Sequence, residues 1–141
     1  MCGIVGEISL DEPTNRQRLY RMNNTLIHRG PDESGVVLAP DGRWGLAHRR
    51  LAVVDLEGGR QPMRDPARGL TLVYNGEVYD HDRIRGELTA RGYPFKTTSD
   101  TEVILAAIGR WGFADALQRL VGMFAIALWD RQDRVLRLAR D

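Results

Sequence analysis

One stretch of the chain, residues 122–129, has apolar side chains at both alternating sets of positions. Because successive side chains of a strand point to opposite faces, this run predicts a strand covered by protein on both sides. Residues 36–38 and 44–47 flank a Pro-Asp-Gly-Arg turn, which predicts a β-hairpin. Further strands are predicted at residues 3–10, 70–74 and 135–140.

Helical patterns separate these groups of strands. Residues 16–27 place Leu19, Met22, Leu26 and Ile27 at helical spacing, which predicts an amphipathic helix on a sheet. A second helix is predicted through Ile84 and Leu88. A third follows a Ser-x-x-Glu capping box at 99–102, and its predicted buried residues are Val103, Ile104, Ala107, Ile108 and Trp111. A fourth, short helix is predicted through Phe113, Leu117, Leu120 and Val121. Hairpin-paired strands with helices between the groups predict an α+β domain of sheets layered with helices.

Composition narrows the function classes. The 141 residues carry a formal net charge of +1, so no bulk electrostatic field favours nucleic acid or a membrane as partner. One cysteine excludes an intramolecular disulfide, and the three histidines lack the spacing of a metal site, so no metal is expected. With neither an apolar membrane-spanning run nor a signal peptide in the sequence, we expect a cytoplasmic protein.

The single cysteine, Cys2, lies one peptide bond from the start of the chain. If Met1 is removed, the same residue carries a thiol and a free α-amine. An ordinary thiol is mostly protonated at pH 7, whereas an α-amine with a pKa of about 8 is partly unprotonated and can take the thiol proton. The sequence therefore predicts a self-activated nucleophile, with a buried structural cysteine as the alternative.

Two polar segments are candidates for the rest of a site. Residues 28–35 form a loop dense in charged groups, which either holds a site together or makes a plain surface turn. Arg49 and Arg50 lie beside an apolar run, and the planar guanidinium of one of them suits a carboxylate at a pocket edge. A surface ion pair is the alternative for these arginines, and the sequence alone favours it.

A strand that ends at Asn75-Gly76 before a helix is a third candidate, because it aims a side-chain amide and a backbone N–H at one point. Two such donors suit an oxyanion hole. Asp100 lies in the first turn of the following long helix, where the helix dipole favours a carboxylate. Asp100 is either an ordinary helix-start residue or a group that binds a cationic amine.

These segments together resemble a known family, the class II glutamine amidotransferase domain of the N-terminal-nucleophile (Ntn) hydrolases, in its asparagine synthetase branch. Seven blocks carry the resemblance in order: Met-Cys-Gly-Ile-Val-Gly at 1–6, His-Arg-Gly-Pro-Asp at 28–32, Arg-Leu-Ala-Val-Val-Asp at 50–55, Gln-Pro at 61–62, Asn-Gly-Glu-Val-Tyr at 75–79, Ser-Asp-Thr-Glu at 99–102 and Gly-Met-Phe-Ala at 122–125. The resemblance implies an αββα sandwich of two mainly antiparallel sheets between helices. It implies that residues 1–141 are a glutaminase domain that is truncated at its C-terminus, with the strand at 135–140 as an open edge and the synthetase domain absent.

The resemblance also implies the roles of individual residues. Cys2 would attack the side-chain amide of L-glutamine, with Asn75 and the Gly76 N–H holding the oxyanion. Arg50 would bind the glutamine α-carboxylate. The remaining implied substrate-binding residues are Leu51, Val53 and Val54 along the pocket, and Glu77 and Asp100 at the α-ammonium group.

In the family, ammonia passes to a synthetase domain that uses ATP and Mg²⁺ to activate aspartate and form asparagine. This chain has no Ser-Gly-Gly-x-Asp-Ser pyrophosphate loop, so ATP and Mg²⁺ are expected only in a separate synthetase domain or subunit. That ammonia acceptor and a second copy of the chain, forming a homodimer, are the protein partners considered. Three alternatives remain: a different ammonia acceptor, a non-catalytic fragment that retains the fold, and a self-processing amidase, which would need a propeptide longer than Met1.

Overall fold

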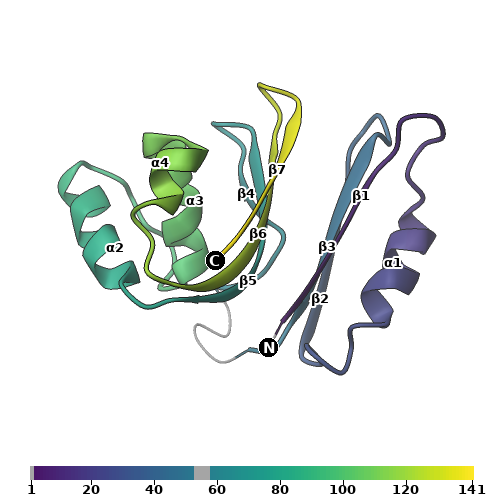
Figure 1. Cartoon of the computed structure of the whole chain (residues 1–141), viewed down its shortest axis with the longest axis horizontal. Coiled ribbons are helices and arrows are strands. Elements are labelled where there is room, and N and C mark those ends of the chain that lie inside the picture. The colour runs from purple at the N-terminus through teal and green to yellow at the C-terminus, as the bar shows by residue number, and fades with distance from the viewer. Residues whose placement is uncertain (1, 53–57) are drawn as a thin grey trace.

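A computed structural model describes residues 2–52 and 58–141. Its described elements form four layers, in which two sheets face each other and helices cover their outer faces (Figure 1). The helices are α1 (Arg16–Asn24), α2 (His81–Ala90), α3 (Asp100–Trp111) and α4 (Phe113–Leu117). The strands are β1 (Gly3–Ile8), β2 (Glu33–Leu38), β3 (Trp44–Arg50), β4 (Met63–Asp65), β5 (Leu70–Val78), β6 (Gly122–Asp130) and β7 (Val135–Arg140).

The first sheet has the order β1-β3-β2 with antiparallel pairs, and the predicted hairpin is its β2–β3 unit. Alternate residues of β3 face opposite layers. Trp44 and Leu46 belong to the apolar cluster between the two sheets, whereas Gly45 faces α1, where a Cβ would lie 2.2 Å from Leu19 Cδ1. The even positions of β3 therefore point into the sandwich, and Arg50 at its end shares that face.

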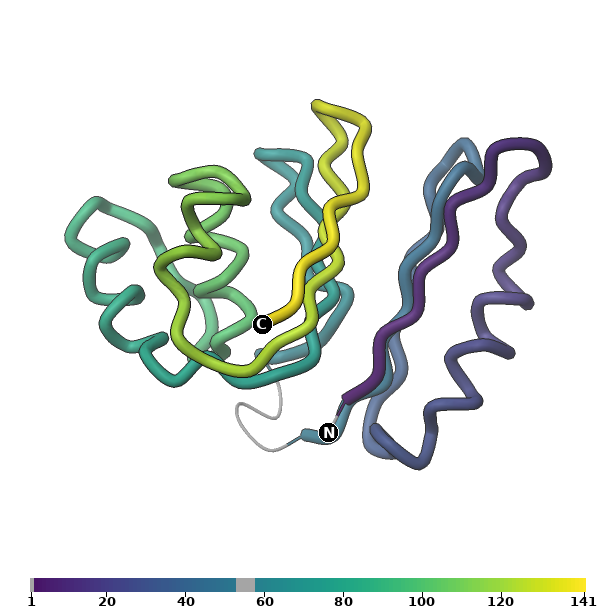
Figure 2. The backbone as a smooth tube through the Cα atoms, in the orientation of Figure 1, coloured from purple at the N-terminus to yellow at the C-terminus, as the bar shows by residue number. Residues whose placement is uncertain are grey.

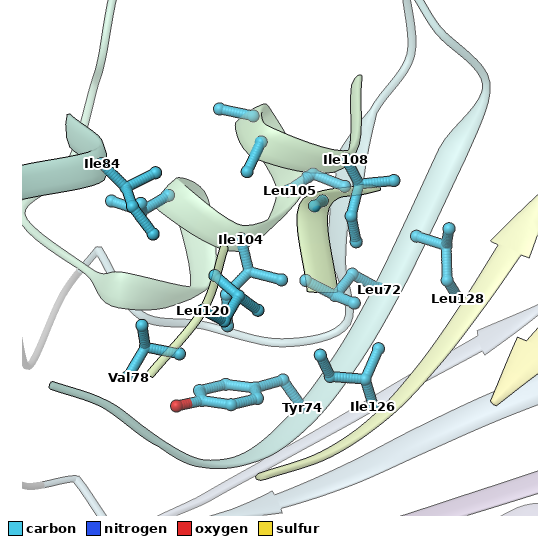
Figure 3. Packing of buried hydrophobic residues seen from close by; sticks show 14 of the residues in the cluster. Leu72, Tyr74, Val78, Ile84, Ile104, Leu105, Ile108, Leu120, Ile126 and Leu128 are labelled. Atoms are coloured by element: carbon cyan, nitrogen blue, oxygen red, sulfur yellow. The ribbon is translucent and has the colours of Figure 1, made fainter. Parts of the chain in front are cut away.

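The second sheet has the order β4-β5-β6-β7, again antiparallel. Ile126 and Leu128 of β6 pack with α3 in the larger core cluster, while Ala127 between them faces the first sheet. Figure 3 shows Leu72, Ile126 and Leu128 directed toward Ile104, Leu105 and Ile108 of α3. The prediction of a strand covered on both sides is thus confirmed at its centre, although Met123 near its start is 59% exposed.

Some predicted boundaries were wrong because apolar residues lie beyond the buried surface. The helix predicted over 16–27 ends at Asn24, where Ile27 is 51% exposed and Leu19 is the fully buried contact. The strand predicted over 3–10 ends at Ile8, and Leu10 is 84% exposed. The short strand β4 was not predicted, since three residues are too few to show alternation.

The prediction of a capping box at the start of α3 is confirmed for Ser99 but not for Glu102. Ser99 caps the helix by accepting a hydrogen bond from the Thr101 N–H, as predicted. Glu102 does not return to the Ser99 N–H; its carboxylate accepts from the backbone N–H groups of Lys96 and Thr97. The Glu102 carboxylate therefore fixes the segment that leads into the helix.

Strand β5 continues through Asn75 and Gly76 to Val78, in register with β6, so the prediction that the strand ends at Asn75-Gly76 was wrong. Its other neighbour, β4, begins at Met63, which lies opposite Leu72, so β4 pairs only with the first residues of β5. The edge of β5 beyond that point has no paired strand among the described residues. This open edge lies at the end of the sandwich where β1 begins and β3 ends (Figure 1).

Candidate active site

Cys2 directly precedes β1, and the β1–β3 register, continued by one residue, places it opposite Arg50 at the end of β3. The Leu51 N–H donates to Cys2 Sγ at 3.4 Å, and the Leu51 carbonyl lies 3.8 Å from the same sulfur. Figure 2 shows the start of β1 beside the segment that leaves β3. The thiol is half-buried and has a backbone N–H directed at it.

The loop predicted over 28–35 ends at Asp32, because Glu33 begins β2. Residues 28–32 hold this corner together, which decides between the two expectations for the loop. Arg29 Nε donates to the Cys2 carbonyl at 3.0 Å, and Asp32 Oδ2 accepts from the Ala52 N–H at 2.8 Å. A Cβ at Gly30 would lie 2.5 Å from the Arg49 carbonyl carbon, so only glycine fits there. The loop therefore positions Cys2 and the residues after β3.

Arg50 is only 5% exposed, so the expectation of a surface ion pair was wrong about its location. Its Nη1 donates to Glu33 Oε2 at 2.9 Å, and Glu33 is also 3.5 Å from Arg60 Nε. A polar cavity of about 360 Å³ opens beside this group. Its described lining residues are Glu33, Ser34, Gly35, His48, Arg50, Arg60 and Gln61. The cavity has room for a small polar molecule at a buried guanidinium.

His48 joins the two sheets. It lies on the inner face of β3, is 1% exposed, and places Nε2 3.0 Å from the Tyr74 carbonyl. Because a carbonyl only accepts, Nε2 carries the proton. Burial lowers the pKa of His48 to about 4, so the ring is neutral at pH 7. Among the described residues, no group of three His, Cys, Asp or Glu side chains is arranged to hold a metal ion.

The backbone of β5 determines where its donors point. The Tyr79 N–H bonds the Val121 carbonyl on the β6 side. Because N–H groups alternate direction along a strand, those of Tyr74, Gly76 and Val78 point to the open edge. Asn75 shares the sheet face of Val73, which packs toward the first sheet.

Gly76 is exposed at this edge, and only glycine fits there. Its φ is +156°, and a Cβ would lie 2.1 Å from the Met123 carbonyl oxygen. The strand therefore presents the Gly76 N–H at an edge that pairs with no strand among the described residues, and Asn75 directly precedes it. That these two groups act together as oxyanion donors stays a prediction.

Asp100 contacts β5 from the first turn of α3. Its Oδ2 accepts from the Tyr74 hydroxyl at 2.7 Å and from the Val78 N–H at 3.4 Å. Burial, followed by the charge of Asp100, raises the pKa of Tyr74, so its hydroxyl remains a donor. Glu77 is exposed on the same face of β5 as Asn75.

The predicted residues thus form two groups. Cys2, Arg50 and Leu51 lie together at the end of β3, and Asn75, Gly76, Glu77 and Asp100 lie at the end of β5. His48 links the two groups through Tyr74. Val53 and Val54, also predicted to line the pocket, lie outside the described residues.

Sequence reasoning assigned no role to three residues here. Gln61 was noted only as part of a motif, His48 was considered only as a metal ligand, and Glu33 only as a loop residue. The alternation Trp44, Leu46, His48 along β3 was the available signal for an inward histidine. No local pattern indicates the contacts of Gln61 or Glu33, which depend on residues far along the chain.

Comparison with known proteins settles the family. The whole chain, residues 1–141, matches the family model described as a glutamine amidotransferase domain. The chain belongs to this glutamine amidotransferase domain family. The match confirms the resemblance inferred from the seven sequence blocks.

This amidotransferase domain is similar to part of several asparagine synthetases. It is 44% identical to asparagine synthetase [glutamine-hydrolyzing] 3 of Bacillus subtilis (strain 168), with 100% of this chain and 23% of the relative covered. It is 39% identical to asparagine synthetase B [glutamine-hydrolyzing] of Escherichia coli (strain K12), with 100% and 25% covered. The chain therefore spans about a quarter of the length of these curated relatives.

A solved structure shares the fold of the amidotransferase domain. The glutamine phosphoribosylpyrophosphate amidotransferase from B. subtilis, complexed with ADP and GMP, superposes with a TM-score of 0.76 at 23% sequence identity. The match covers 99% of this chain and 36% of that one. The predicted α+β sandwich of the Ntn type is confirmed. In the part of the chain that the structure describes, no helix has the length and apolar character needed to cross a bilayer.

Proposed function

We propose that this amidotransferase domain hydrolyses L-glutamine to glutamate and ammonia, with Cys2 as the nucleophile. One observation carries the proposal: Cys2 Sγ accepts the Leu51 N–H at 3.4 Å, and Arg50, the residue before Leu51, is buried at a polar cavity. A nucleophile next to a carboxylate-binding group is the arrangement that an amino-acid amide requires. The family match supplies glutamine as the amide.

The reaction begins after removal of Met1, when the α-amine of Cys2 takes the thiol proton. The sulfur bonds to the side-chain amide carbon of glutamine, and the carbonyl electron pair moves to oxygen. The Asn75 amide and the Gly76 N–H stabilise that oxyanion. As the carbon–nitrogen bond breaks, the α-ammonium returns its proton to the leaving nitrogen, which departs as ammonia. Water then cleaves the γ-glutamyl thioester, releasing glutamate and the thiol.

Substrate binding uses both ends of the site. Arg50 holds the α-carboxylate, sharing its guanidinium with Glu33, whose carboxylate keeps it in place. Glu77 and Asp100 bind the α-ammonium group. Leu51 lines the pocket in this proposal, and the resemblance assigns the same role to Val53 and Val54, which lie outside the described residues.

The ammonia produced has a proposed destination. Asparagine synthetases are similar to this chain over its whole length, which supports transfer to a cytoplasmic synthetase domain or subunit that activates aspartate with ATP and Mg²⁺. In this proposal residues 1–141 form the glutaminase part alone. Another amide-forming acceptor is the second candidate, and it differs from the first only outside these residues.

The decisive experiment treats the purified chain with 6-diazo-5-oxo-L-norleucine, a glutamine analogue that alkylates such nucleophiles. Intact mass and peptide mapping should show loss of Met1 and one adduct on Cys2. Ammonia release from glutamine should stop in step with labelling. A folded chain that neither hydrolyses glutamine nor labels at Cys2 would be a non-catalytic member of the family, and the proposal would fail.

A further inference from the structure

Side chains occupy the open edge of β5 on both sides of Gly76. The Tyr74 N–H donates to Gln61 Oε1 at 2.6 Å, and the Tyr74 carbonyl accepts from His48 Nε2 at 3.0 Å. The Val78 N–H donates to Asp100 Oδ2 at 3.4 Å. Where a neighbouring strand would satisfy these groups, three side chains do so instead. The Gly76 N–H lies between them.

Gln61 is held in place through both its side-chain amide and its backbone. Its Nε2 donates to Thr101 Oγ1 at 3.4 Å, and Thr101 is 2% exposed in the first turn of α3. Its backbone carbonyl packs on β2, where a Cβ at Gly35 would lie 1.8 Å from the Gln61 oxygen. The Gln61 amide is therefore a fixed acceptor that joins β5 to α3.

The Tyr74 peptide that Gln61 holds precedes the two proposed oxyanion donors directly. Asn75 follows it, and the Gly76 N–H lies about 7 Å further along an extended strand. An oxyanion hole acts only when its donors lie at hydrogen-bond distance from the developing charge, and a misplacement of about 1 Å can reduce the rate about a hundredfold. Loss of the Gln61 bond would free the strand just before these donors.

We propose that Gln61 is a positioning residue for the oxyanion hole, acting through the Tyr74 peptide on Asn75 and Gly76. This inference rests on the proposed function, since it concerns the rate of glutamine hydrolysis. Gln61 has no contact with the reacting atoms in this role. Its effect falls on transition-state stabilisation and therefore on kcat more than on KM.

The test compares Gln61→Met, which removes the acceptor at similar size, with Gln61→Glu, which retains it. Arg50 and Arg60 line the same cavity as Gln61, so the added carboxylate has cationic neighbours. We expect Gln61→Met to lower kcat about tenfold while KM changes less than about threefold. Gln61→Glu should recover most of that kcat. Gln17→Met, on the exposed side of α1, is the matched control and should hydrolyse glutamine at the unmodified rate.

A double-variant cycle separates positioning from general stability. With Asn75→Ala already in place, Gln61→Met should lower kcat clearly less than it does alone, because the hole it positions is already damaged. A merely structural role would shift the unfolding midpoint and leave kcat of the folded fraction unchanged. If Gln61→Met does not fold, Gln61→Asn, one methylene too short to reach Tyr74, replaces it.

Each outcome decides the proposal. An unchanged kcat, an effect confined to KM, full additivity with Asn75→Ala, or failure of both Gln61→Met and Gln61→Asn to fold would overturn the role of Gln61. If the unmodified chain releases no ammonia, or if Cys2→Ala still does, the proposed function itself fails. An active, Cys2-dependent chain with a fully active Gln61→Met variant removes only this inference.

Discussion

Glu33 and Arg50 face each other across the β2–β3 ladder, and Arg50 Nη1 donates to Glu33 Oε2 at 2.9 Å. The pair differs from an ordinary surface ion pair because the Arg50 side chain is 6% exposed and that of Glu33 is 29% exposed. A buried guanidinium is fixed in direction by its carboxylate partner, so the orientation that a substrate meets is set before binding.

Arg50→Lys tests whether the fixed orientation of the Arg50 guanidinium matters for glutamine binding. Lysine keeps the charge but loses the bidentate geometry, so we expect KM for glutamine to rise about tenfold with kcat changed little, as for the loss of one charged hydrogen bond. Steady-state ammonia release measures both constants. Arg60→Lys is the control, since Arg60 approaches the same Glu33 but its side chain is 77% exposed, and it should change neither constant. Equal effects of the two variants would remove Arg50 from carboxylate binding.

Changing the nucleophile should be decisive. Cys2→Ala should abolish ammonia release, and Cys2→Ser should nearly do so, because a hydroxyl is a much weaker nucleophile beside so mild a base as an α-amine. Thermal unfolding midpoints near that of the unmodified chain would show that both variants fold. Residual activity in Cys2→Ala, measured with freshly purified glutamine, would contradict the mechanism.

Removing one oxyanion donor should affect the chemical step. Asn75→Ala should lower kcat about a hundredfold or more, with KM nearly unchanged, because the amide acts on charge that exists only in the transition state. Rapid-quench detection of the γ-glutamyl thioester would locate the loss in its formation. A variant whose only change is weaker glutamine binding would assign Asn75 to substrate binding.

His48 makes stability depend on pH. Burial lowers its pKa from 6.5 to about 4 in the folded chain, so the unfolded chain binds a proton more readily. The neutral His48 side chain therefore contributes about 3 kcal/mol to the free energy of unfolding above pH 6.5, and this contribution is lost as pH falls toward 4. Urea unfolding at a series of pH values should show this decline. His48→Gln keeps a donor for the Tyr74 carbonyl and should flatten it; an unchanged slope would mean that other groups cause it.

Gly76 and Gly86 differ in the space available for an added Cβ, so substituting alanine at each should change stability in opposite directions. Gly76→Ala places a Cβ 2.1 Å from the Met123 carbonyl oxygen and should lower the free energy of unfolding by about 3 kcal/mol. Gly86 lies exposed in α2 with no atom within 4 Å of the added Cβ, so Gly86→Ala should stabilise by about 0.5–1 kcal/mol. Chemical denaturation measures both. Similar values for the two would mean that β5 relaxes away from β6 at this point.

The features predictable from the sequence are those that neighbouring residues encode. The Pro-Asp-Gly-Arg hairpin and the doubly apolar run of β6 are local patterns, and both were correct. Gly76 was placed at a strand end because Asn-Gly is a local turn signal, whereas the pairing that extends the strand comes from β6, some 50 residues later in the chain.

The candidate site shows the same division. Residue types at Cys2, Asn75 and Asp100 indicated chemistry, but the contacts that give them neighbours are long-range. Leu51 meets Cys2 only when β1 pairs with β3, and Gln61 meets Tyr74 only when β4 pairs with β5. The depth of Arg50 was missed for a related reason, because charge alone predicts exposure and only the alternation along the assembled β3 sends it inward.

Because β4 begins only at Met63, part of the β5 edge is left without a neighbouring strand, and this limits which insertions the proposed site can accept. If β4 began several residues before Met63, the added residues would pair with the edge that now carries the Gly76 N–H. Such a sandwich would be better hydrogen-bonded, and the proposed site would have no vacant donor for an incoming carbonyl. In the proposed mechanism, a glutamine carbonyl at this edge takes the place that a further strand residue would occupy. Insertions that lengthen β4 should therefore be compatible with folding and incompatible with hydrolysis.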